Sequence, residues 1–286
     1  MLVLAATSTA HAGRGTALTK YLPDDVSMAL VADVSHFRSS KLVAQADEVL
    51  RHHSARWKAL ADAGVPLADD VDTFLVAATG TSTSAREVYT IIDGKTSVLL
   101  DKLKTDQVRK HAGVTYYKLA DAELAIVDKH LIIAPEGGMD AVIDRARGKG
   151  ANAASSERAQ TFRTSISAPS GIDLWGATVI DEPTRNSASS QLNVKLEWVG
   201  FAMAIATNAT LNLRFGCSDA DSATAMSAWI TGKLDDASFR DGIAKLFGDG
   251  FVANVSIDRD GTVVRASGTL SSDDVEQLAR GVNTWF

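Results

Sequence analysis

The sequence contains a single cysteine, Cys217, among its 286 residues. One cysteine cannot form an intramolecular disulfide, and it cannot supply a multi-cysteine metal site. A catalytic thiol also needs a base and an orienting group nearby, and the residues around Cys217 supply neither. We therefore expect a small buried thiol at the end of the apolar run that precedes it.

Clustered basic residues and long apolar runs are also missing. The chain has 29 Lys and Arg against 35 Asp and Glu, a formal net charge of -6, and the basic residues are scattered between acids. Neutralising phosphates requires clustered Lys and Arg, so we predict no nucleic-acid partner. No apolar run approaches the roughly 18–20 residues that cross a bilayer, so we predict no transmembrane segment in the mature chain.

Two short motifs resemble ligand-binding loops but lack residues that such loops require. Residues 94–97 (Gly-Lys-Thr-Ser) look like the end of a phosphate-binding loop, but the glycine required five residues earlier is Tyr89. Residues 258–261 (Asp-Arg-Asp-Gly) resemble the start of a calcium loop, but they lead directly into an apolar run. Asp-Gly between apolar runs favours a β-hairpin instead.

No set of residues therefore qualifies as a catalytic, cofactor-binding or metal site. The histidines lack the spacing of four that places two zinc ligands on one helix face. No cofactor is predicted, and an enzyme is the less favoured interpretation. Acidic residues that pair only in the folded chain cannot be seen in a sequence, which leaves a hydrolase as a weaker alternative.

Residues 1–12 have the pattern of the end of a secretory signal peptide. An apolar start, Met1 to Ala6, is followed by Ala10-His11-Ala12, a small-residue cleavage pattern. The positively charged front of such a signal is not in the sequence, so we treat this stretch as a signal-peptide remnant. A disordered Ala-rich terminus is the alternative. The remnant predicts an extracytoplasmic protein, either periplasmic or secreted.

Paired segments indicate an internal duplication. Residues 125–133 and 255–264 each have an apolar stretch, a polar break and a second apolar stretch. Each precedes an expected helix that contains Ala-Arg-Gly, at 146–148 and at 279–281. Self-similarity of this kind is typical of repeated structural units.

The expected fold class is α+β, with two tandem copies of a β-α-β-β-α-β-β-α-like unit and antiparallel sheets carrying helices on one face. The domains are a signal-peptide remnant at 1–12, a first α+β repeat at 13–150 and a second at 151–286. The first copy is expected to contain strands at 28–34, 72–79, 86–93, 114–119 and 123–134, with helices at 39–62, from 94 and from 137. In the second copy we expect strands at 172–180 and within 181–200. Residues 148–160 are expected to form the linker between the two copies.

The opening of the mature chain resembles a known group of proteins. Leu22-Pro23-Asp24-Asp25 leads into a strand that includes Ala32-Asp33-Val34, and Phe37-Arg38-Ser39-Ser40 follows. This order resembles uncharacterised bacterial secreted or envelope proteins that open with Leu-Pro-x-Asp, a strand and Phe-Arg-x-Ser. The resemblance implies an extracytoplasmic α+β protein of unknown activity, and it transfers no catalytic residues.

The favoured function is a non-enzymatic binding or structural module of the bacterial cell envelope, whose partner is an unknown protein or envelope component. The alternative is a carrier of an apolar, lipid-like ligand, held in a cleft between helices and sheet. Four tryptophans bear on this choice, because aromatic side chains either fill the core or line a groove: Trp175, Trp198, Trp229 and Trp285.

Overall fold

The chain is described from a computed structural model. The structure describes residue 15 and residues 17–38, 71–80, 87–95, 107–119, 121–167, 171–206, 208–271 and 273–274. The predicted signal-peptide remnant at 1–12, the predicted helix at 39–62 and Trp285 lie outside these residues.

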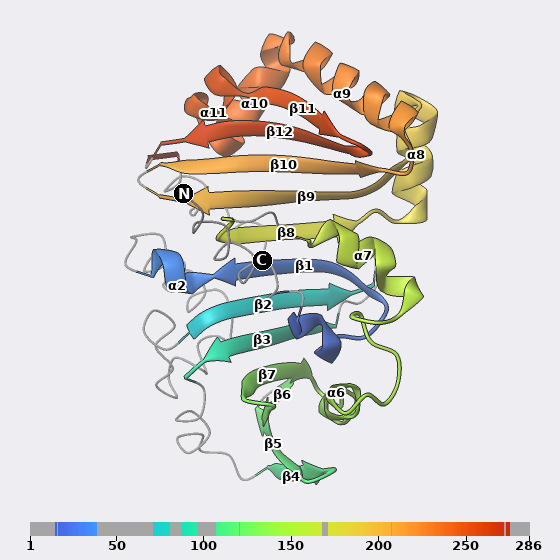
Figure 1. Cartoon of the computed structure of the whole chain (residues 1–286), viewed down its shortest axis with the longest axis vertical. Coiled ribbons are helices and arrows are strands. Elements are labelled where there is room, and N and C mark those ends of the chain that lie inside the picture. Colours follow the sequence, from blue (N-terminus) through green and yellow to red (C-terminus); the bar gives the residue numbers. More distant parts are fainter. Residues whose placement is uncertain are drawn as a thin grey trace, which may run out of the picture.

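The described strands form one antiparallel sheet of 12 strands in the order β11-β12-β10-β9-β8-β1-β2-β3-β7-β6-β5-β4 (Figure 1). The strands are β1 (Val26–Asp33), β2 (Val71–Thr79), β3 (Val88–Gly94), β4 (Val108–His111), β5 (Val114–Leu119), β6 (Ala122–Val127), β7 (His130–Pro135), β8 (Leu174–Val179), β9 (Leu196–Ile205), β10 (Ala209–Cys217), β11 (Ser256–Asp260) and β12 (Val263–Leu270).

The prediction of two tandem copies is wrong, because strands from both halves of the chain enter this single sheet. Strand β1 pairs with β2 on one side and with β8 on the other, and Val31 lies opposite Trp175. Both strands carry small or apolar side chains at this seam, so they can pack as interior strands. The hydrogen-bonded sheet is continuous across the boundary predicted at 150–151, and the division into two domains stays a prediction.

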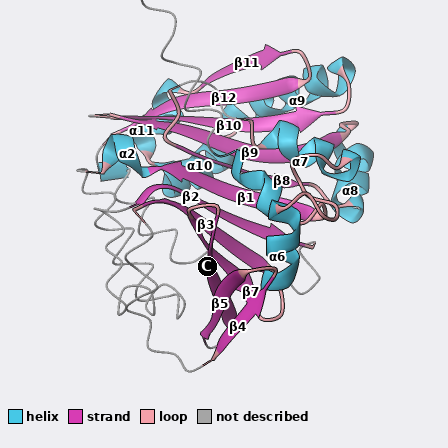
Figure 2. Cartoon of the chain, turned by 60° about the horizontal axis from the view of Figure 1, so that its bottom comes forward, coloured by secondary structure: helices cyan, strands magenta, loops and turns pink. Residues whose placement is uncertain are grey.

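Helices cover both faces of the sheet, so the expectation of helices on one face is also wrong. Trp175 and Ala177 of β8 pack in the cluster that contains the side chains of α6 and α7, which Figure 2 shows along one face. Leu174, one residue away, packs with Phe247 and Phe251 of α10 and α11. Neighbouring residues of a strand point to opposite faces, so these two clusters lie on opposite sides of the sheet.

The described helices are short apart from α9. They are η1 (Thr19–Tyr21), α2 (Val34–Phe37), α6 (Met139–Ala146), η4 (Glu157–Ala159), α7 (Gln160–Ser165), α8 (Glu182–Leu192), α9 (Ala220–Leu234), α10 (Ala237–Phe247) and α11 (Asp249–Asn254). None of them is long and apolar enough to cross a membrane.

Three local expectations need correction. Residues 123–134 form two strands, β6 and β7, because Asp128 and Lys129 take positive φ values and turn the chain. Residues 181–200 begin with helix α8, where the Asp181 side chain accepts a hydrogen bond from the Thr184 backbone N–H, as at a typical helix start. The expected linker at 148–160 contains η4 and the first residue of α7. The hairpin predicted at 258–261 is confirmed, since it joins β11 to β12.

Candidate functional site

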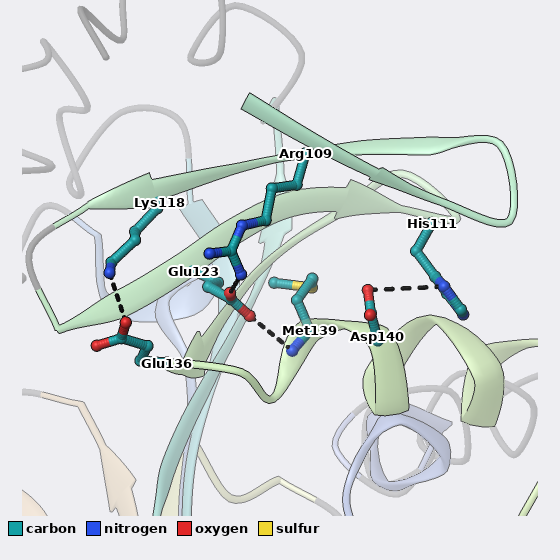
Figure 3. A network of polar contacts seen from close by, with 7 residues as sticks. All are labelled: Arg109, His111, Lys118, Glu123, Glu136, Met139 and Asp140. Atoms are coloured by element: carbon teal, nitrogen blue, oxygen red, sulfur yellow. Dashed lines mark hydrogen bonds and ion pairs between the residues drawn. The ribbon is translucent and has the colours of Figure 1, made fainter. Parts of the chain in front are cut away.

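Ionisable side chains gather where helix α6 packs on the β4–β7 end of the sheet (Figure 3). The strands in this region form successive hairpins, and α6 follows β7 after a short turn. We call the group the α6 network; it consists of Arg109, His111, Lys118, Glu123, Glu136, Asp140, Asp144 and the backbone N–H of Met139. Sequence analysis predicted no site here.

Glu123 lies at the centre of the α6 network, and its side chain is only 1% exposed. Its Oε2 accepts a hydrogen bond from the Met139 backbone N–H at 3.0 Å, and its Oε1 lies 3.3 Å from Arg109 Nη1. The first turn of a helix leaves N–H groups without partners and carries positive potential. The N-cap residue Gly138 has no side chain to meet that need, so the Glu123 carboxylate from β6 meets it.

His111 joins the end of β4 to the outer side of α6. Its Nε2 lies 3.1 Å from Asp144 Oδ1, and its Nδ1 lies 3.7 Å from Asp140 Oδ1. The two aspartates are four residues apart and share a helix face, while Met139 and Ile143 are buried in the core. The hydrogen bond with His111 lowers the pKa of Asp144, so this carboxyl stays ionised and bound to the hairpin.

Two further groups complete the surroundings of the α6 network. Tyr116 of β5 is 5% exposed, and burial together with the nearby Asp140 carboxylate raises its pKa. Lys118 and Glu136 form an ion pair at the opposite end of the hairpin. The Glu136 side chain is 54% exposed, so we expect this pair to add little to stability.

The α6 network and the adjoining Tyr116 contain the residue types of an acid–base site, since together they combine a histidine, carboxylates and a phenol. The groups of the network, however, bond to one another or to the start of α6. Among the residues that the structure describes, no group of three His, Cys, Asp or Glu side chains is arranged to hold a metal ion. The geometry therefore supports a role in fixing α6 against the β4–β5 hairpin.

A surface hollow of about 400 Å³ lies elsewhere, at helices α10 and α11. Three aspartates and Lys245 contribute to its lining together with Ala244 and Gly248. This lining is charged, which does not match the dry apolar cavity that a lipid-like ligand needs. The hollow shares no lining residue with the α6 network.

Three tryptophans in the described part of the chain and the cysteine pack in the core. Trp175 and Trp198 are each 2% exposed, and Trp175 Nε1 donates a hydrogen bond to the Ile166 carbonyl at 2.9 Å. Trp229 is partly buried and makes an edge contact with Phe239. Cys217 is buried at the end of β10, and this burial raises the pKa of its thiol to about 11.

Sequence reasoning missed the α6 network because its contacts join residues from separate elements. One signal was available: Glu123 is an acid inside the otherwise apolar segment 122–127. A buried carboxylate must find hydrogen-bond donors, but the sequence does not say that the donors are a helix start and Arg109.

No known protein family and no curated protein matches the chain in sequence. Two chains among the solved structures match in fold. One is crystal form I of TP0453, which is 15% identical in sequence and superposes with a TM-score of 0.52. The match covers 94% of this chain and 97% of that chain. The overall fold of this chain is therefore similar to that of TP0453.

Proposed function

We propose that the chain is a non-enzymatic, extracytoplasmic binding module of the bacterial cell envelope, and that it binds an extended acidic segment of another envelope protein along strand β4. The small-residue cleavage pattern Ala10-His11-Ala12 supports the compartment. The observation that carries the binding mode is the exposed edge of β4, the last strand of the described sheet.

The hydrogen-bond pattern indicates which backbone groups of β4 face outward. Residues 109 and 111 lie opposite 116 and 114, and the Gln107 carbonyl accepts a hydrogen bond from the Lys118 N–H at 3.0 Å. In an antiparallel pair, every second residue bonds to its partner strand and the residues between point the other way. Val108 and Lys110 therefore direct their N–H and C=O groups away from β5.

The α6 network holds this edge in place. Arg109 and His111 of β4 are tied to Glu123 of β6 and to Asp144 of α6. A strand already fixed in its extended form has less entropy to lose when a partner pairs with it. The ionisable groups of the α6 network would in this way prepare β4 for pairing with a partner strand.

The side chains of β4 favour an acidic partner. Val108 is 53% exposed, Lys110 is exposed, and the Arg109 side chain is 52% exposed although it contacts Glu123. An added strand gains main-chain hydrogen bonds from the edge and specificity from alternate side chains. Acidic residues in that strand would meet Lys110 and Arg109 with opposite charge.

Photocrosslinking in cells tests the proposal. A crosslinking amino acid replaces Val108, and the control carries it at Leu246, which is 49% exposed on α10. We expect an adduct with another envelope protein from position 108 that is absent from position 246. Identification of an acidic segment at the crosslinked position would support the assigned partner.

A matched pair of variants tests the strand-addition mode. Lys110→Pro removes an outward N–H without breaking the bonds to β5, while Lys110→Ala removes the same side chain and keeps the N–H. We expect the adduct to disappear with Lys110→Pro and to persist, more weakly, with Lys110→Ala. Equal adducts from both variants, or an adduct with a second copy of the chain, would contradict the proposal. Recovery of the full-length protein in the cytoplasm alone would contradict the compartment.

A further inference from the structure

Arg214 is a buried cation in strand β10, at a distance from the α6 network along the sheet. The residue is only 9% exposed. Its Nη1 donates a hydrogen bond to the Ser167 carbonyl at 3.0 Å, and its guanidinium carbon lies 5.1 Å from the centre of the Trp198 ring. Its Nε is buried and has no hydrogen-bond partner.

No carboxylate from the described part of the chain balances the charge of Arg214. The residue directly opposite on β12 is Arg265, a second cation. Burial and, to a smaller extent, the charge of Arg265 lower the pKa of Arg214. A buried charge is costly unless it is paired and hydrogen-bonded, so this position favours a negative partner.

Arg265 does have acidic partners. Its Nη2 lies 2.7 Å from Asp260 Oδ2, and its Nη1 lies 3.9 Å from Asp258 Oδ2. Both aspartates are largely exposed, with side-chain exposures of 72% and 63%. The aspartates of β11 therefore pair with Arg265 near the sheet edge. Arg214 has no such counter-charge among the described residues.

Polar side chains continue along the same face of β10 and β12. Asn212 and Ser267 lie opposite each other, two residues from Arg214 and Arg265. The Ser267 hydroxyl donates a hydrogen bond to Asn212 Oδ1 at 2.6 Å. Residues two apart on a strand share a face, so the four side chains form one polar strip beside the Trp198 ring.

We propose that Arg214 and Arg265 form a binding site for an anionic group of a ligand, a carboxylate or a phosphate, distinct from the β4 edge. The free Nε–H of Arg214 supplies a donor in the fixed geometry with which guanidinium groups hold carboxylates and phosphates. Arg265 adds charge from the facing strand. The bound anion offsets the buried charge that the described residues leave unbalanced.

A purely structural role is the competing explanation. In that case Arg214 serves to hold the Ser167 carbonyl, at the link between α7 and β8, against the sheet. That role involves no ligand, so it predicts that neither anion shifts the Arg214 Nε–H signal saturably, whereas an anion site predicts a saturable shift. The two explanations therefore predict different results for an anion titration of the wild-type chain.

The experiment follows the Arg214 Nε–H signal by NMR while sodium phosphate or sodium acetate is added, with ionic strength held constant by sodium chloride. We expect a saturable shift with at least one of the two anions, and the stronger of them identifies a phosphate or a carboxylate as the preferred group. Arg214→Gln should bind that anion about 10 to 100 times more weakly, the loss expected for one charge-assisted hydrogen bond.

The matched control is Lys195→Gln, which removes an exposed cation whose side chain is 66% exposed. We expect its affinity for the anion to equal that of the wild type. An Nε–H signal that neither anion moves, or equal anion affinity in Arg214→Gln and the wild type, would overturn the proposal. Should Arg214→Gln fail to fold, the titration of the wild-type signal decides the question alone.

Discussion

Replacing Glu123 tests the idea that one buried carboxylate holds α6 to the sheet. In Glu123→Gln, the amide oxygen can still accept from the Met139 N–H, but the amide NH₂ cannot accept from Arg109. Hydrogen bonds to charged groups contribute about 1.5–3 kcal/mol. Because Arg109 is half exposed, water replaces part of the lost contact. We therefore expect the free energy of unfolding to fall by about 1.5 kcal/mol.

Glu123→Ala should cost more, since it also leaves the Met139 N–H buried without a partner and opens a cavity. We expect about 3–5 kcal/mol, the range for breaking a buried polar pair by removing one member. The matched control is Glu136→Gln at the exposed ion pair, where we expect a change within about 0.5 kcal/mol.

Urea unfolding gives the free energies, and hydrogen exchange at residues 139–146 shows where stability is lost. We expect the amides of α6 to lose protection in both Glu123 variants before the amides of β1 and β2 do. Two results would refute the reasoning: a Glu123→Gln variant as stable as the control, or unchanged protection in α6.

Three further predictions concern other parts of the structure. Cys217 should react with a thiol reagent at about pH 8 far more slowly in the folded chain than in denaturant. Burial raises the pKa of its thiol to about 11 and blocks access of the reagent. Equally fast reaction in both states would show an exposed thiol. Desolvation lowers the pKa of His130 in the folded chain. As the pH falls below about 6.5, the unfolded chain therefore binds a proton at this histidine before the folded chain does. The stability that His130 contributes above about pH 6.5 is lost as the pH falls through the lower folded-state pKa. Urea unfolding between about pH 7.5 and 5 should therefore show a smaller loss of stability for His130→Phe than for the wild type, and an identical pH dependence would contradict this. Gly216→Ala should destabilise by about 1–3 kcal/mol, because the added Cβ would lie 2.0 Å from the Trp198 ring, whereas Gly232→Ala on α9 meets no atom within 4 Å and should be neutral or stabilising in thermal melts.

Local features of the fold were predictable from the sequence. The strands expected at 72–79 and 114–119 are found as β2 and β5 almost to the residue, and Asp-Gly at 260–261 predicted the β11–β12 hairpin. These features depend on neighbouring residues, which the sequence displays directly. Strand β8, predicted at 172–180, is found at Leu174–Val179.

The joining of the two halves was not predictable in the same way. The pairing of β1 with β8 depends on two strands that are distant in sequence and compatible with several partners. Helix α8 was missed because apolar residues alternate through 192–198, while the signals for a helix, Asp181 and Pro183, precede that stretch. The α6 network could not be predicted from the sequence, because it also depends on contacts between separate elements. Glu123 contacts the Met139 N–H only after the hairpins have formed.

The seam between β1 and β8 has a consequence for how the chain acquires its structure. Met28 pairs with Thr178, so one side of β1 lacks its neighbour until more than half of the polypeptide has been synthesised. Contacts between residues so distant in sequence slow folding, because the loop between them must close first. In the meantime an apolar strand edge is open to pairing with other chains. This interval favours association between incompletely folded chains, so refolding yields should fall steeply as protein concentration rises.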